Sequence, residues 1–212
     1  MTWVKSTLRR AARNPRLIGL LIVLCLDLVV IGFVGRQIVG SAHRPFDSDE
    51  AYHTMRGLKL AQDLSQGKVR AFLVDAYEQS LYPPGQAALQ AVVFILFGAS
   101  TVSARLCSLG SLVVATLAIY GIGLELEPRK GHVIGLVAVG LTLTSQYLLV
   151  LSGLVMLEVT GLAVTMVTLL LYLRSVRPDS GWRPRVMTSL LLSAALLVKY
   201  PFGLMVLATV SI

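Results

Sequence analysis

The sequence predicts an all-α integral membrane protein, a polytopic helical bundle with further helices along its outer surface. Of its 212 residues, 55% are hydrophobic and only 14% are charged, whereas about a quarter of the residues in a soluble domain are charged. The apolar residues form runs of about twenty, the length that a helix needs to cross the roughly 30 Å hydrocarbon core. The runs lack the strict alternation of a transmembrane barrel, so helices remain as the spanning structure.

Five apolar runs are expected to span the membrane. They cover residues 17–39, 106–126, 133–151, 154–173 and 186–200. The first run follows several arginines, as in a secretory signal, but it is too long for a signal-peptide core and further runs follow, so we interpret it as a retained helix. Residues 40–105 form an outer loop that includes a shorter apolar stretch, residues 83–98.

Basic residues predict the orientation. They cluster in residues 5–16, 128–130 and 174–185, and the positive-inside rule places all three segments in the cytoplasm. The N-terminus is then cytoplasmic and residues 40–105 lie outside, so residues 83–98 cannot cross and must lie along the outer surface or re-enter. Because the net charge of +8 comes from these flanking clusters, we expect no nucleic-acid partner.

This topology brings charged residues from three segments to the outer face. They are Asp49 and Glu50 after the first span, Glu158 at the start of the fourth span, and Lys199 near the end of the fifth. Charges at membrane level are costly and usually mark a functional site. The alternatives are structural, since the acids can cap a surface helix from Ser48 or Asp49 and the later residues can extend to the interface.

Other polar residues accompany this cluster. His53 follows Asp49 by four residues, so the two are either metal ligands on one helix face or solvated side chains. Tyr82 precedes Pro83-Pro84-Gly85, which starts a new helix. Arg105 begins the second span, where it can bind phosphate or a lipid. Asp27 lies deep in the first span without an evident partner.

Five short motifs in order resemble the GT-C superfamily of membrane glycosyltransferases, in the branch of protein O-mannosyltransferases and lipid A aminoarabinose transferases. The motifs are FDSDEAYH (46–53), YPPG (82–85), LFG followed by ARL (96–98 and 104–106), SGLVMLEV (152–159) and LVKYP (197–201). Their order and shared topology are more specific than any one of them. Since members of the superfamily are longer, residues 1–212 are expected to form an incomplete, N-terminal part of a GT-C-like transmembrane catalytic domain.

The resemblance implies inverting transfer of a sugar from a polyprenyl-phosphate donor to a lipid, glycan or protein hydroxyl at the periplasmic, extracellular or lumenal face. Asp49 is the expected general base. Glu50 and Glu158 are expected to orient it or a basic group, or to hold a divalent metal ion with Asp49 or His53. The remaining substrate-binding candidates are Lys199, Arg105, Tyr82 and His53.

Two other functions stay open. A non-catalytic or truncated membrane subunit fits a chain that ends at Ile212 within apolar sequence. A transporter needs polar residues near the bilayer midplane, and only Asp27 is placed there. Motifs of soluble nucleotide chemistry are absent from the sequence.

Overall fold

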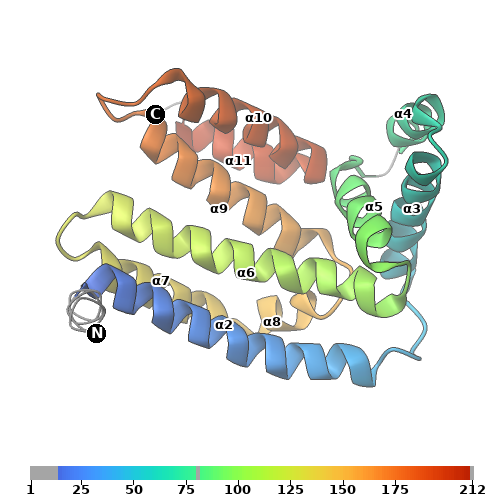
Figure 1. The fold of residues 1–212 in the computed structure, drawn as a ribbon, viewed down its shortest axis with the longest axis horizontal. Helices are drawn as coiled ribbons and strands as arrows, with labels where there is room; N and C mark the ends of the chain where they lie inside the picture. Colours follow the sequence, from blue (N-terminus) through green and yellow to red (C-terminus); the bar gives the residue numbers. More distant parts are fainter. Residues whose placement is uncertain (1–13, 80–81, 211–212) are drawn as a thin grey trace, which may run out of the picture.

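The computed structural model describes residues 14–79 and 82–210, and these residues form ten helices and no strand (Figure 1). The predicted all-α fold class is confirmed. The helices are α2 (Pro15–Gly40), α3 (Ser48–Ser65), α4 (Val69–Tyr77), α5 (Gly85–Phe97), α6 (Thr101–Leu126), α7 (Gly131–Leu143), α8 (Gln146–Ser152), α9 (Leu157–Ser175), α10 (Trp182–Val198) and α11 (Tyr200–Val210).

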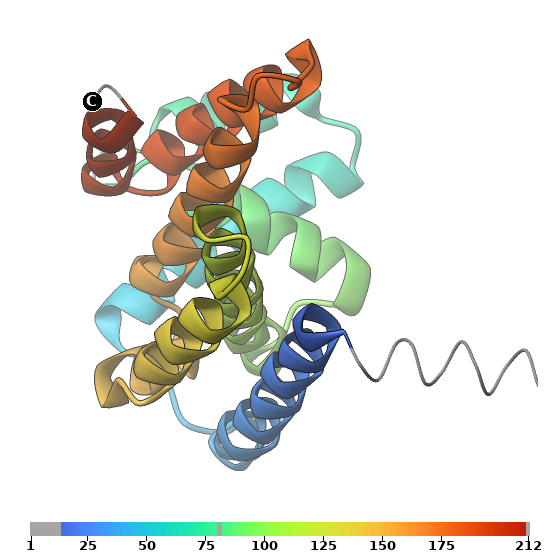
Figure 2. The same ribbon diagram turned by 90° about the vertical axis from the view of Figure 1, so that its left-hand side faces the viewer.

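The long helices lie side by side, with α6 in the centre against α2, α7 and α9 (Figures 1 and 2). Within the described residues α2, α6 and α9 are long and apolar enough to cross a membrane, and the bent pair α7–α8 makes a fourth crossing if it is one span. Leu28, Val29 and Phe33 on α2 are 61–69% exposed. Such large exposed apolar side chains suit a surface that faces lipid.

Local signals explain where the long helices begin. Pro15 is the first residue of α2, where its missing N–H costs nothing, and the Asn14 side chain accepts a hydrogen bond from the Arg16 N–H at 3.1 Å. Before α6, Ser100 and Ser103 each accept the other's backbone N–H at 3.0 Å. Gly98 ends α5 with a φ of +81°, a conformation that favours glycine. The chain therefore passes from α5 into α6 through a short turn.

The predicted span at residues 133–151 is broken in the structure, because α7 and α8 meet at an angle of 72°. Hydroxyl side chains account for the break. Thr142 and Thr144 donate to the carbonyls of Ala138 and Leu141 at 2.9 and 3.0 Å, and Ser145 is the N-cap of α8. Such local hydrogen bonds compete with a continuous helix, and a hydropathy pattern does not register them.

Helices α3, α4 and α5 lie across one end of the bundle (Figure 1). Leu60 of α3 and Ala91 of α5 are fully buried in a cluster with Ala104 of α6 and Val155 of the α8–α9 connection, which fixes this layer to the long helices. The expected surface helix is present, but its N-cap is Asp47, not Ser48 or Asp49 as predicted. Asp49 therefore lies in the first turn of α3.

The predicted run at residues 186–200 ends in a break. Pro201 has no N–H to donate to the carbonyl of Leu197, so a continuous helix is disfavoured. Helix α10 ends at Val198, Lys199 has extended backbone angles (φ −160°, ψ 124°), and α11 starts at Tyr200 and packs back on α9 and α10. The break points the Lys199 side chain toward α9.

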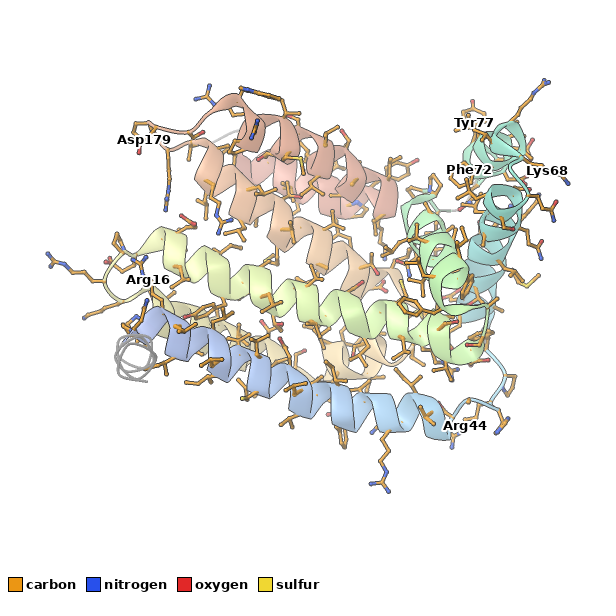
Figure 3. All side chains as sticks on the ribbon, viewed as in Figure 1. Arg16, Arg44, Lys68, Phe72, Tyr77 and Asp179 are labelled. Atoms are coloured by element: carbon orange, nitrogen blue, oxygen red, sulfur yellow. The ribbon has the colours of Figure 1, made fainter. Side chains whose placement is uncertain are left out.

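Labelled side chains mark the two ends of the bundle. Arg16 at the start of α2 and Asp179 in the α9–α10 connection mark one end, and Lys68, Phe72 and Tyr77 mark the other (Figure 3). Arg16 donates to the carbonyl of Pro128 at 2.9 Å, which places two of the three basic segments together. We call this end the basic end and the other the α3–α5 end.

Candidate active site

Four segments of the chain converge beside the α3–α5 end. Asp49 and His53 come from the first two turns of α3, Glu158 from the first turn of α9, and Lys199 from the break between α10 and α11. The ring of Tyr82, just before α5, contacts the His53 ring at 5.0 Å between centroids and is tilted by 53° to it. The structure therefore brings five of the predicted site residues together.

Glu158 and Lys199 form the central ion pair of this site. The Lys199 Nζ donates to Glu158 Oε1 at 2.8 Å, and the two side chains are 30% and 31% exposed. An ammonium group has three donors, so this contact leaves Lys199 able to bind a further oxygen. The pair is thus charged and partly exposed, and its ammonium group keeps hydrogen-bond donors that the pair does not use.

His53 is only 5% exposed. Burial lowers the pKa of His53 below its ordinary value of 6.5, the Lys199 charge acts in the same direction, and the nearby Asp49 and Glu158 carboxylates oppose it. The rings of Tyr52 and Tyr82 surround the imidazole at 5.5 and 5.0 Å. His53 is therefore neutral at pH 7 and enclosed by aromatic rings, unlike the solvated histidine that the sequence allowed.

Asp49 is the exposed member of the cluster. No side chain of the described residues forms a hydrogen bond or ion pair with its carboxylate. It lies one turn before His53 on α3 and is close enough to act on the charge of that imidazole. A free carboxylate on the open side of the site is suited to accept a proton from a molecule that binds there.

Glu50 and Arg105 pair with each other and not with the open site. The carboxylate accepts Arg105 Nε at 3.0 Å and Nη2 at 2.9 Å, and it also accepts the backbone N–H of Val155 at 3.0 Å and of Asp47 at 3.4 Å. Glu50 is 1% and Arg105 3% exposed. The expected basic partner of Glu50 is thus Arg105 itself.

Further contacts complete the hydrogen bonding of the Glu50–Arg105 pair. Arg105 Nη1 donates to the carbonyl and the hydroxyl of Ser41, both at 3.1 Å, and the guanidinium lies 5.4 Å from the ring centre of Phe46. Burial alone raises the pKa of Glu50, but the Arg105 hydrogen bonds and charge together with the Val155 N–H hold it below its ordinary value. The pair ties α3, α6, the end of α2 and the α8–α9 connection together.

Asp49, His53 and Glu158 do not form a metal site in this geometry. In the described ranges no three His, Cys, Asp or Glu side chains lie close enough to hold one metal ion. The residues therefore do not fit the divalent ion that the sequence left open.

A groove of about 780 Å³ runs beside the site between α5, α6, α9 and α10. Most of its lining is apolar, and on α9 it begins at Thr160, two residues after Glu158. Representative lining residues are Leu89 and Val93 of α5, Leu106 and Val114 of α6, Val164 of α9 and Leu191 of α10.

Asp27, left without a role by the sequence, has a partner in Thr116 of α6. It is 3% exposed, and its two carboxyl oxygens lie 2.9 and 3.0 Å from the Thr116 hydroxyl. This contact joins α2 to α6 inside the bundle, away from the candidate site. The sequence did not indicate the contact between Asp27 and Thr116, because an isolated threonine in an apolar run does not identify a partner.

Fold and site together define an all-α helical membrane protein with a charged cluster near one end and an apolar groove between α5, α6, α9 and α10. The family model of dolichyl-phosphate-mannose-protein mannosyltransferases matches residues 82–211, more than half of the chain. The chain therefore belongs to this family of mannosyltransferase-type glycosyltransferases, and the resemblance to GT-C enzymes is confirmed. No curated protein and no solved structure matches the chain.

The matched range contains four of the predicted site residues, which are Tyr82, Arg105, Glu158 and Lys199. The α3 residues Asp49, Glu50 and His53 precede it. The site thus combines segments inside and outside the matched range.

Proposed function

We propose that this chain transfers a sugar from a polyprenyl-phosphate donor to an acceptor hydroxyl at the outer face of the membrane, with inversion at the anomeric carbon. The observation that carries the proposal is the half-open Glu158–Lys199 pair, 2.8 Å apart, beside the exposed carboxylate of Asp49. A cation with free donors and a nearby free carboxylate are what a phosphate leaving group and a hydroxyl nucleophile require.

The donor has an apolar and an ionic part, and the site offers a place for each. The groove between α5, α6, α9 and α10 suits a polyprenyl chain, because it is open and mostly apolar and is lined by α6 and α9, which are long and apolar enough to cross a membrane. In this proposal the lipid lies in the groove and its phosphate reaches Lys199, whose remaining donors bind the phosphate oxygens.

The transfer is a single displacement. The acceptor oxygen forms a bond to the anomeric carbon as the bond from that carbon to the phosphate oxygen breaks. The bonding electrons leave with the phosphate, where Lys199 stabilises the added charge, and the acceptor proton passes to Asp49. A phosphate departs without strong acid assistance, in contrast to glycoside hydrolysis, so the site needs one base and no paired general acid.

Glu158, His53 and Tyr82 position these groups. Glu158 holds the Lys199 ammonium by an ion pair of 2.8 Å, and a neutral His53 between tyrosine rings offers a nitrogen acceptor or donor without adding charge. Glu50 and Arg105 act at a distance, because their pair fixes the start of α3 and hence the direction of Asp49. We assign them as positioning residues.

The orientation rests on the charge asymmetry of the bundle. Arg16 and Asp179 lie at the end opposite the site (Figure 3), where Arg16 joins the basic segment at residues 128–130 through the carbonyl of Pro128, and the positive-inside rule assigns that end to the cytoplasm. The N-terminus is then cytoplasmic, and the site faces the periplasm, the cell exterior or the lumen. We place the protein in the plasma membrane as a multi-pass protein.

The test is transfer of radiolabelled sugar by membranes that contain the chain. Donors are dolichyl- and polyprenyl-phosphate-linked sugars, starting with mannose and a protein acceptor, as the family description suggests. We expect Asp49→Asn to abolish transfer and leave membrane insertion intact, with Asp179→Asn at the basic end as the matched control.

Two outcomes contradict the proposal. Transfer that survives in Asp49→Asn removes Asp49 as the base. Absence of transfer from every donor with the wild-type chain contradicts the transferase function itself and favours a non-catalytic subunit.

A further inference from the structure

Two glutamines of α5 are buried without partners. Gln86 is 1% and Gln90 0% exposed, and among the described residues neither the oxygen nor the nitrogen of either amide has a hydrogen-bond partner. They are one turn apart and therefore face the same side of α5. Neither residue takes part in the site described above.

These amides lie where α5 meets α3 and the end of α10. A Cβ added to Gly57 of α3 would be 2.7 Å from the Gln90 Cβ and 2.8 Å from its amide oxygen, so only glycine allows this close contact. Gly85 approaches the carbonyl of Leu197 and the N–H of Val198 equally closely, at 2.6 and 2.9 Å from its added Cβ. Gln86 is thus adjacent to the segment that carries Lys199.

Unpaired buried amides are unusual and costly. Native proteins leave few buried polar groups unsatisfied, because each such amide loses its hydrogen bonds to water and nothing replaces them. Two further orphan groups lie on the facing part of α3, the hydroxyls of Tyr52 and Thr54. Most of the orphan polar atoms in the described part of the chain therefore gather at the α3–α5 contact, beside the candidate active site.

We infer that Gln86 and Gln90 bind the hydroxyl groups of the transferred sugar and so select the donor. This inference rests on the proposed function and adds its sugar-recognition site. A glutamine amide offers two N–H donors and an acceptor oxygen with two lone pairs, and uncharged hydroxyl groups complement both. The phosphate matches the Lys199 cation and the lipid the apolar groove, so the sugar is the donor part that matches neutral amides.

The aromatic residues of the site come from α3 and from the segment just before α5. The rings of Tyr52, His53 and Tyr82 contact one another at 5.0–5.9 Å, and His53 is one turn before Gly57 on α3. Since the amide atoms are closed to solvent in this state, sugar binding requires the contact between α3 and α5 to open. The amides then exchange an unsatisfied state for hydrogen bonds to the ligand.

The test compares two lipids on the purified full chain. We measure dissociation constants for polyprenyl phosphate and for a panel of polyprenyl-phosphate-linked hexoses and pentoses, with wild type, Gln86→Met, Gln90→Met and the control Gln62→Met, an exposed position of α3. Methionine keeps the shape of glutamine and removes the amide. We expect each α5 variant to bind its preferred sugar lipid about tenfold more weakly, with unchanged affinity for polyprenyl phosphate.

The following binding results would overturn the inference that Gln86 and Gln90 bind the sugar. A wild-type chain that binds no sugar lipid more tightly than polyprenyl phosphate overturns the inference. So do α5 variants that keep the preference, or that lose affinity for both lipids equally, since that is a packing effect. Donors lacking one sugar hydroxyl provide a second measurement on wild type, and the inference fails if none of them binds about tenfold more weakly. Sugar preference without transfer contradicts the proposed function alone.

Discussion

Two acid–base pairs lie near the same end of the bundle and differ in burial and in hydrogen bonding. Glu50–Arg105 and Glu158–Lys199 are both short, at 2.9 and 2.8 Å. The first pair has side chains that are 1% and 4% exposed, and the second has side chains that are 31% and 30% exposed. The first is saturated by Val155, Asp47 and Ser41, whereas the second keeps free donors.

The difference separates an anchor from a binding group. A buried, bidentate and fully hydrogen-bonded pair cannot exchange partners without a large penalty, so Glu50 and Arg105 suit a fixed connection between helices. A half-exposed lysine exchanges partners at low cost. Each pair joins one acidic and one basic side chain from separate segments of the chain, and burial and hydrogen bonding distinguish their roles.

The largest expected effect follows from removing one member of the Glu50–Arg105 pair. Arg105→Met leaves the Glu50 carboxylate buried and unpaired, which costs about 3–5 kcal/mol in the free energy of unfolding. The double variant Glu50→Leu/Arg105→Met removes both charges and recovers most of this loss. Denaturation of the purified protein in detergent measures both. A loss below about 1 kcal/mol in the single variant contradicts the anchoring role.

The second expected effect concerns the open pair. Lys199→Met removes the cation that stabilises the departing phosphate, and we expect the rate of transfer to fall by about 10²–10³ with little change in stability. Lys59→Met is the matched control, because the Lys59 side chain is 53% exposed on α3. Transfer within a fewfold of wild type in Lys199→Met would assign the phosphate to another group.

Much of this arrangement was predictable from the sequence. Apolar run lengths predicted the helical membrane fold, and charge counting placed Asp49, Glu158 and Lys199 at one face. The motif order predicted the family. These inferences depend on local hydropathy, charge and short motifs, which a linear sequence carries.

The pairings were not predictable, because they depend on three-dimensional contacts. Glu50 and Arg105 are 55 residues apart, and nothing local indicates that they bind each other and not the substrate. Gln86 and Gln90 lie in an apolar helix, and only the three-dimensional structure shows that both amides are buried without a hydrogen-bond partner among the described residues. The angle between α7 and α8 likewise depends on individual hydroxyl contacts.

The third prediction concerns the pH dependence of stability, to which His53 and the Glu50–Arg105 pair contribute in different pH ranges. The pKa of His53 lies below its ordinary value of 6.5, so its stabilising contribution is present above 6.5 and is lost as the pH falls through the folded value. The pKa of Glu50 lies below its ordinary value of 4.5, so the anchor's contribution is lost only below 4.5. Acidification from about pH 7 to about pH 5 should therefore destabilise the protein through His53 while the anchor stays intact.

Melting temperature against pH measures this. We expect His53→Gln to flatten the decline between these pH values and the control His43→Gln, at an exposed position, to leave it unchanged. An equally steep decline in His53→Gln assigns the titration to a different group.

The smallest expected effect comes from a third ion pair, which tests whether burial is the deciding variable. Arg174 Nε lies 2.9 Å from Glu125 Oε1, the same distance as in the Glu50–Arg105 pair, but the Arg174 side chain is 48% exposed. Arg177 also contacts Glu125, so the carboxylate keeps a partner when Arg174 is removed. Arg174→Gln should change the free energy of unfolding by less than about 1 kcal/mol and leave transfer unchanged. A loss as large as that of Arg105→Met would show that distance, and not burial, determines the contribution of these pairs.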